Sequence, residues 1–220
     1  MLVKQNLETF SKQISKEITL VAVSKTKPIS DIMEAYEAGQ RIFGENKIQE
    51  MVNKYEALPK DIKWHMIGHL QSNKVKYMAH FVNLIHGVDS FKTLKEINKQ
   101  AKKHNRVIDC LLQVRIAKEE TKFGLEFSEI ENILKSDELA LLENVNISGL
   151  MGMASFSSDK DEVSKEFQSL KTLFDKMNDS NMKLDILSMG MSGDFKLAIK
   201  NGSNMIRVGS AIFGSRNYIV

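Results

Sequence analysis

Two cationic side chains adjoin apolar segments of the chain and could react with, or hold, an anionic ligand. Lys25 comes directly after the segment Leu20–Ser24, and Arg207 lies in the segment Met205–Val208. A lysine amine that is partly desolvated loses proton affinity and can form a Schiff base with a carbonyl group. An arginine stays protonated, and beside a pyridine nitrogen it would keep that nitrogen unprotonated and weaken the ring as an electron sink.

Each of these residues also has an ordinary explanation that involves no ligand. Lys25 could be a solvated loop lysine, because the chain contains 31 lysines and arginines in total. Arg207 could be an interior arginine that pairs with the carboxylate of Glu45 or Asp185. The residue types alone leave these alternatives open.

Two glycine–serine pairs near the end of the chain could bind a phosphate group. Ser192–Gly193 precedes a predicted helix at Phe195–Ile199, and Gly209–Ser210 precedes a short turn. Glycine lets the backbone approach an anion, serine adds a hydroxyl, and the N–H groups at a helix start supply donors. Either pair could also be a simple glycine turn. A Schiff-base lysine together with a phosphate site indicates either pyridoxal 5′-phosphate (PLP) or a sugar phosphate handled by an aldolase.

Eight short apolar segments alternate with longer amphipathic ones, which is typical of parallel strands joined by helices. Eight such units fit a closed (β/α)8 TIM barrel, where binding residues lie at the C-terminal strand ends. A doubly wound sheet is the alternative, but it usually has a glycine-rich loop after its first strand, and Ser24–Pro28 contains no glycine. The predicted strands are Leu20–Ser24, Arg41–Gly44, Trp64–Ile67, Asn83–Val88, Ile108–Arg115, Ile147–Met153, Ile186–Met189 and Met205–Val208.

Two helix starts carry recognisable capping signals. Asp89 or Ser90 can cap a helix that follows the fourth predicted strand. Ser128, followed three residues later by Glu131, resembles a capping box and predicts a helix that begins there.

Composition limits the class of protein. The 220 residues contain 42% hydrophobic and 27% charged residues, which is ordinary globular usage and predicts one domain over residues 1–220. A net charge of +3 is too small to indicate nucleic acid or an anionic membrane as a partner.

One cysteine excludes an intramolecular disulfide. His65 and His69 flank a strand end, where their spacing does not bring them together, so no metal site is predicted. Without a recognisable signal sequence or membrane-length apolar run, we expect a cytoplasmic protein.

Six segments, in order along almost the whole chain, resemble the pyridoxal phosphate homeostasis protein family. They are LVAVSKTKP (Leu20–Pro28), FGENKIQE (Phe43–Glu50), WHMIGHLQSNK (Trp64–Lys74), GLMGM (Gly149–Met153), LSMGMSGD (Leu187–Asp194) and RVGSAIFGSRNY (Arg207–Tyr218). The resemblance implies a single TIM barrel similar to the N-terminal domain of alanine racemase. It also implies a protein that binds PLP and acts as a carrier or buffer of this aldehyde without established turnover.

The resemblance also implies roles for individual residues, with no catalytic residue and no metal ligand among them. Lys25 would be the Schiff-base lysine, and Arg207 would face the pyridine nitrogen. Lys122 matches a loop lysine linked to cofactor transfer. The remaining cofactor-binding positions are Asn46 beside the cofactor, Ser192, Gly209 and Ser210 at its phosphate, and Met153.

A PLP-dependent amino-acid racemase is the main alternative function. Such enzymes of this fold take a second base from an additional domain, for which 220 residues leave no room, and only Tyr218 could replace that base. An aldolase would need a carboxylate near Lys25, for which Glu45 is the one candidate. The expected partners are PLP and PLP-dependent apoenzymes, and we expect a monomer. Compared with the family, the N-terminal helix is expected to be trimmed and the lysine-rich tail is missing.

Overall fold

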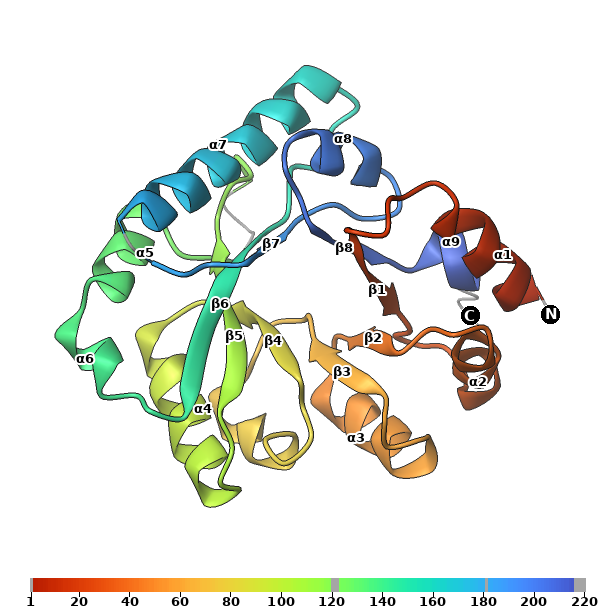
Figure 1. Ribbon diagram of the computed structural model, residues 1–220, viewed down its shortest axis with the longest axis horizontal. Coiled ribbons are helices and arrows are strands. Elements are labelled where there is room, and N and C mark those ends of the chain that lie inside the picture. The colour runs from red at the N-terminus through yellow and green to blue at the C-terminus, as the bar shows by residue number, and fades with distance from the viewer. Residues whose placement is uncertain (1, 120–122, 181, 216–220) are drawn as a thin grey trace.

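The computed structural model describes residues 2–119, 123–180 and 182–215. Eight parallel strands form a closed barrel in chain order, and the last strand pairs with the first (Figure 1). The strands are β1 Thr19–Val23, β2 Ile42–Glu45, β3 Lys63–Met66, β4 Leu84–Val88, β5 Ile108–Val114, β6 Val145–Gly152, β7 Ile186–Ser188 and β8 Met205–Val208. Each overlaps its predicted segment, so the TIM barrel is confirmed and the doubly wound sheet is wrong.

Helices form an outer layer around the ring of strands, as Figure 1 shows. They are α1 Leu2–Ser11, α2 Ile29–Glu37, α3 Ile48–Ala57, the 3₁₀ helix η1 Ser72–Tyr77, α4 Phe91–Lys103, α5 Phe127–Leu134, α6 Asp137–Ala140, α7 Lys160–Asp179, α8 Phe195–Lys200 and α9 Ser210–Phe213. Helix α1, expected to be short, joins the end of the barrel through a hydrogen bond from Asn6 Nδ2 to the Ile212 carbonyl at 3.0 Å. Within the described ranges, none of the helices combines the length and apolarity needed to span a bilayer.

One predicted helix start is confirmed and the other is wrong. Ser90 caps α4, and its Oγ accepts a hydrogen bond from the Thr93 N–H at 3.2 Å. Ser128 instead lies inside α5, because Glu126 is the capping residue. The Glu126 N–H donates to the Glu129 carboxylate at 2.8 Å. Glu126 and Glu129 therefore form the capping box predicted for Ser128 and Glu131.

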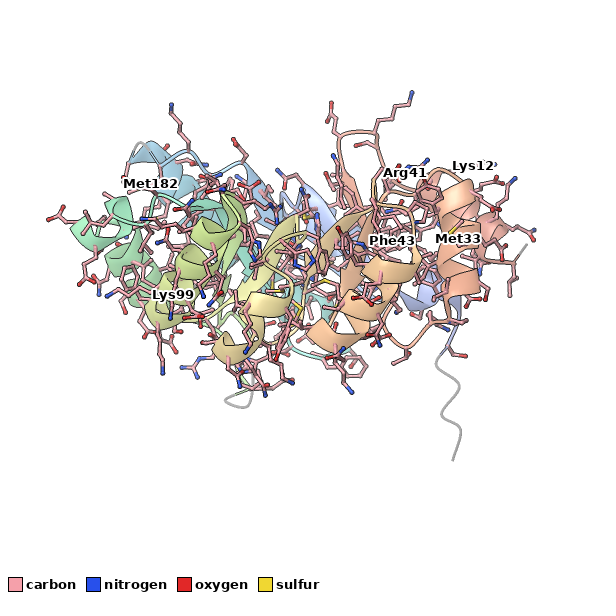
Figure 2. The ribbon with its side chains drawn as sticks, turned by 90° about the horizontal axis from the view of Figure 1, so that it is seen from below. Lys12, Met33, Arg41, Phe43, Lys99 and Met182 are labelled. Carbon is pink, nitrogen blue, oxygen red and sulfur yellow. The ribbon has the colours of Figure 1, made fainter. Side chains whose placement is uncertain are left out.

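Strand side chains alternate between the barrel interior and the layer under the helices. The interior cluster consists of Val21, Leu84, Leu111, Met151 and Met205. By the same alternation His86 and Arg207 face the interior, whereas Glu45 faces outward. Figure 2 shows side chains filling the space between strands and helices; Phe43, labelled there, is fully buried, and Lys99 is exposed.

Candidate functional site

A cavity of about 520 Å³ lies where the C-terminal ends of β1, β2, β6, β7 and β8 meet. This volume is in the usual range for small-molecule sites, roughly 300–1,000 Å³. All seven residues predicted from the sequence to bind a cofactor line it, namely Lys25, Asn46, Met153, Ser192, Arg207, Gly209 and Ser210. The fold therefore brings together positions that are up to 185 residues apart in the chain (210 − 25). Lys122 and Tyr218 lie outside the described residues.

Lys25 is partly exposed and directly follows β1, and both of its chain neighbours are hydrogen-bonded to carboxylates. On one side, the buried Ser24 Oγ donates to Glu45 Oε1 at 2.6 Å. On the other side, the N–H of Thr26 donates to Glu50 Oε1, also at 2.6 Å. These bonds fix the place from which the Lys25 side chain enters the cavity.

The ammonium group of Lys54 on α3 joins these attachments. Its Nζ donates to the Ser24 carbonyl at 2.8 Å, to Glu45 at 2.8 Å and to Glu50 at 2.7 Å. We call Ser24, Glu45, Glu50 and Lys54 the lysine anchor. Burial raises the pKa of Glu45, while Lys54 and Ser24 act in the opposite direction. Because Glu45 is fully buried against α3 and is absent from the described lining of the cavity, it does not serve as the carboxylate that an aldolase would need.

Arg207 lines the cavity from β8, and its side chain is almost fully buried. Its Nη1 donates to the carbonyl and hydroxyl oxygens of Ser188 at 3.0 and 2.7 Å, and its Nη2 donates to the Gly152 carbonyl at 3.0 Å. Burial lowers the pKa of Arg207 to about 10, so it remains protonated near neutral pH. Among the described residues, neither Glu45 nor Asp185 pairs with it, and that alternative is wrong.

The two glycine–serine pairs meet at one edge of the cavity. The Gly209 N–H donates to Ser192 Oγ at 3.3 Å, which ties the turn after β7 to the turn after β8. A Cβ atom at Gly209 would lie 3.2 Å from the Val23 carbonyl oxygen, whereas one at Gly193 would meet nothing within 4 Å. Ser192, Gly193 and Ser210 all line the cavity, and their hydroxyl and backbone N–H groups are donors of the kind that bind phosphate.

The sequence did not predict the residues that hold the two cations in place, nor all of the residues that line the cavity. The loop after β6 contributes Ser155, Phe156 and Ser157 to the lining. Ser188 and Lys54 support the two cations, and only the i,i+4 spacing of Glu50 and Lys54 hinted at one of these contacts. His65 contacts His86 rather than His69, and no group of three or more metal-binding side chains occurs in the described part of the chain.

Comparisons with known proteins agree with this architecture. The family model described as "Alanine racemase, N-terminal domain" matches residues 2–217. The pyridoxal phosphate homeostasis protein of Aquifex aeolicus (strain VF5) is 43% identical over 202 residues, which cover 90% of this chain and 87% of the relative. PipY of Synechococcus elongatus PCC7942, solved with PLP bound, has a TM-score of 0.88 at 34% identity and covers 96% of this chain and 100% of PipY.

Alanine racemase of Clostridium difficile 630 shares the fold alone. Its TM-score is 0.84 at 15% identity, and the match covers 99% of this chain but 58% of the racemase. The relative from Aquifex and the family model, by contrast, both match at the level of sequence over most of the chain. The chain therefore belongs to the pyridoxal phosphate homeostasis protein family, and its barrel is an alanine racemase N-terminal domain.

Proposed function

We propose that this protein binds PLP as a Schiff base on Lys25 and takes part in intracellular PLP homeostasis without robust catalytic turnover. The observation that carries the proposal is the single cavity on which Lys25, Arg207 and the Ser192–Gly209 contact all lie. PipY, solved with PLP bound, supports it at 34% identity. PLP supplies an aldehyde that condenses with amines and a ring that withdraws electrons.

Each lining residue has a part in this proposal. Lys25 supplies the amine, which must lose its proton before it attacks a carbonyl carbon. Ser192, Gly209 and Ser210 hold the phosphate, and Asn46 and Met153 lie beside the ring. Arg207 uses three of its five N–H donors on described residues, which leaves two for a ligand.

The proposed lack of turnover is supported by two features of the cavity. A protonated arginine beside a ring nitrogen disfavours protonation of that nitrogen and so weakens the electron sink that racemases need. In addition, neither tyrosine nor histidine is found among the described residues that line the cavity, so none of them offers a second base of either type. The relatives are named homeostasis proteins rather than enzymes, which agrees with this proposal.

The proposal extends to the surroundings of the protein. We infer a monomer in the cytoplasm that passes PLP to PLP-dependent apoenzymes. The partly exposed position of Lys25 supports transfer, because an incoming amine can reach a ligand held there.

The test of PLP binding is the substitution Lys25→Ala. We expect the wild-type protein to give a visible absorbance band with PLP and a borohydride-trappable adduct on Lys25, and the variant to give neither. Lys47→Ala is a matched control, because Lys47 is an exposed lysine one residue after Asn46 and is absent from the described lining. A wild-type protein that forms no adduct on Lys25 in excess PLP would contradict the proposal.

Turnover is tested separately. The PLP-loaded protein is incubated with one enantiomer of alanine or serine in deuterated water, and α-deuteration is followed by NMR. We expect a rate no higher than that of free PLP. A steady, protein-dependent rate well above that level would instead favour the racemase.

A further inference from the structure

Arg207 is the first member of a hydrogen-bonded series that crosses the barrel interior. Its Nη1 donates to Ser188 Oγ at 2.7 Å, and Ser188 Oγ lies 3.2 Å from His86 Nδ1. His86 Nε2 in turn lies 3.0 Å from His65 Nδ1. The four residues come from β8, β7, β4 and β3, and none has more than 4% of its surface exposed.

The direction of every bond in this series follows from the arginine, which can only donate. Ser188 Oγ accepts from Arg207, and among the described residues its own hydrogen has only His86 Nδ1 as an acceptor. A buried hydroxyl hydrogen rarely goes without an acceptor. His86 therefore accepts at Nδ1 and carries its proton on Nε2, which donates to Nδ1 of His65.

The series ends at the far side of the barrel. With Nδ1 accepting, His65 carries its proton on Nε2, and its remaining side-chain partner is Asn83, an exposed residue directly before β4. Burial lowers the pKa of His65 to about 3 and also lowers the pKa of His86, so both rings are neutral. Lys63 and Arg207 add to these shifts, because a second positive charge beside either ring is unfavourable.

We propose that Ser188, His86 and His65 form a neutral positioning chain that fixes the Arg207 guanidinium against the ring nitrogen of the cofactor. This inference rests on the proposed PLP site. We call the three residues the arginine chain. Because none of them carries a charge, they hold the guanidinium in place without neutralising it. The positive charge of Arg207 then acts on the ligand. This charge favours a ring nitrogen that accepts a hydrogen bond over one that carries a proton.

The first test needs no PLP and examines the arginine chain alone. Histidine ¹⁵N NMR of the ligand-free protein should show His65 and His86 as neutral rings protonated on Nε2 near neutral pH. Ser188→Ala should shift the Nδ1 resonance of His86, while the resonances of the exposed His104 stay in place. A protonated ring, or a proton on Nδ1 of either residue, would overturn the inference.

The second test compares two replacements of His86 that are similar in size. The glutamine of His86→Gln can accept from Ser188 and donate to His65, whereas the leucine of His86→Leu can do neither. We expect His86→Leu to bind PLP about tenfold more weakly and His86→Gln to stay within about threefold of wild type. With ring-¹⁵N-labelled PLP, the ring nitrogen should move toward the protonated form in His86→Leu only. If His86→Leu does not fold, Ser188→Ala provides the same test, because it also removes a member of the arginine chain.

The outcomes separate this inference from the proposed function. All variants keep Lys25, so each should still give the borohydride-trapped adduct. Wild-type affinity and an unchanged ring-nitrogen resonance in both His86→Leu and Ser188→Ala would show that the chain only fills the barrel, and the inference would be wrong. A wild-type protein that traps no PLP would instead remove the proposed function, whatever the histidine tautomers are.

Discussion

Lys25 and Arg207 line the same cavity, yet the groups behind them differ in charge. Behind Lys25, the lysine anchor combines the ammonium of Lys54 with the carboxylates of Glu45 and Glu50. Behind Arg207 the acceptors found among the described residues are neutral, namely the oxygens of Ser188 and Gly152, and the Asp194 carboxylate acts on it through its charge. Lys25 is thus supported by residues that form ion pairs, whereas Arg207 is supported by the dipoles of a hydroxyl and two carbonyl groups.

The difference matches the chemistry proposed for each cation. The lysine anchor contacts the main chain of Ser24 and Thr26, the two neighbours of Lys25, and so fixes where the Lys25 side chain begins. The arginine chain acts on the guanidinium itself, whose charge is constant. The described contacts thus act on the main chain beside Lys25, and on the side chain of Arg207.

The largest effect should come from removing the cation of the lysine anchor. Lys54→Met leaves the fully buried Glu45 carboxylate without its ion partner, and we expect the free energy of unfolding to fall by about 3–5 kcal/mol. Urea unfolding measures this loss. The double variant Lys54→Met/Glu45→Leu should recover much of it, because a well-packed apolar pair avoids the buried charge. If the double variant is no more stable than Lys54→Met, the charge of Glu45 is not the cause.

A smaller effect should appear on the arginine side when the pH falls. An unfolded histidine takes up a proton near its ordinary pKa of about 6.5, whereas folded His65, with a pKa of about 3, does not. The unfolded state then binds more protons, so stability decreases with falling pH. His65 alone should account for about 2 kcal/mol between about pH 7 and about pH 5.

Urea unfolding at both pH values checks this expectation. The variant His65→Gln lacks the titrating ring, so its loss between the two pH values should be smaller than that of the wild type by the same 2 kcal/mol or so. Equal losses in the two proteins would show that His65 titrates normally in the folded state.

The sequence predicted the features that depend on local pattern. Short apolar segments gave all eight strands, and the rule that barrel sites lie at C-terminal strand ends placed Lys25 and Arg207 on one cavity. The resemblance to the family added Asn46 and Met153, which also line that cavity. Their roles toward PLP stay predictions.

The sequence did not predict the groups that support the two cations, because those contacts join distant segments. Lys54 meets Ser24 across 30 residues, and Arg207 meets Gly152 across 55. Each contact depends on barrel closure and on strand register, where a shift of one residue turns a side chain to the opposite face. Register also decides that Glu45 faces α3 instead of the cavity.

The smallest effect is expected at Thr26, and it tests whether the lysine anchor acts through the main chain. Thr26 has a φ of 63°, a left-handed conformation that costs an L-residue about 1–2 kcal/mol. Thr26→Gly removes that cost but adds freedom to the unfolded chain worth about 0.5–1 kcal/mol. The N–H that donates to Glu50 is kept, so we expect unfolding free energy to change by less than about 1 kcal/mol. A loss above about 2 kcal/mol in urea unfolding would show that the threonine side chain, and not the main chain, carries the attachment.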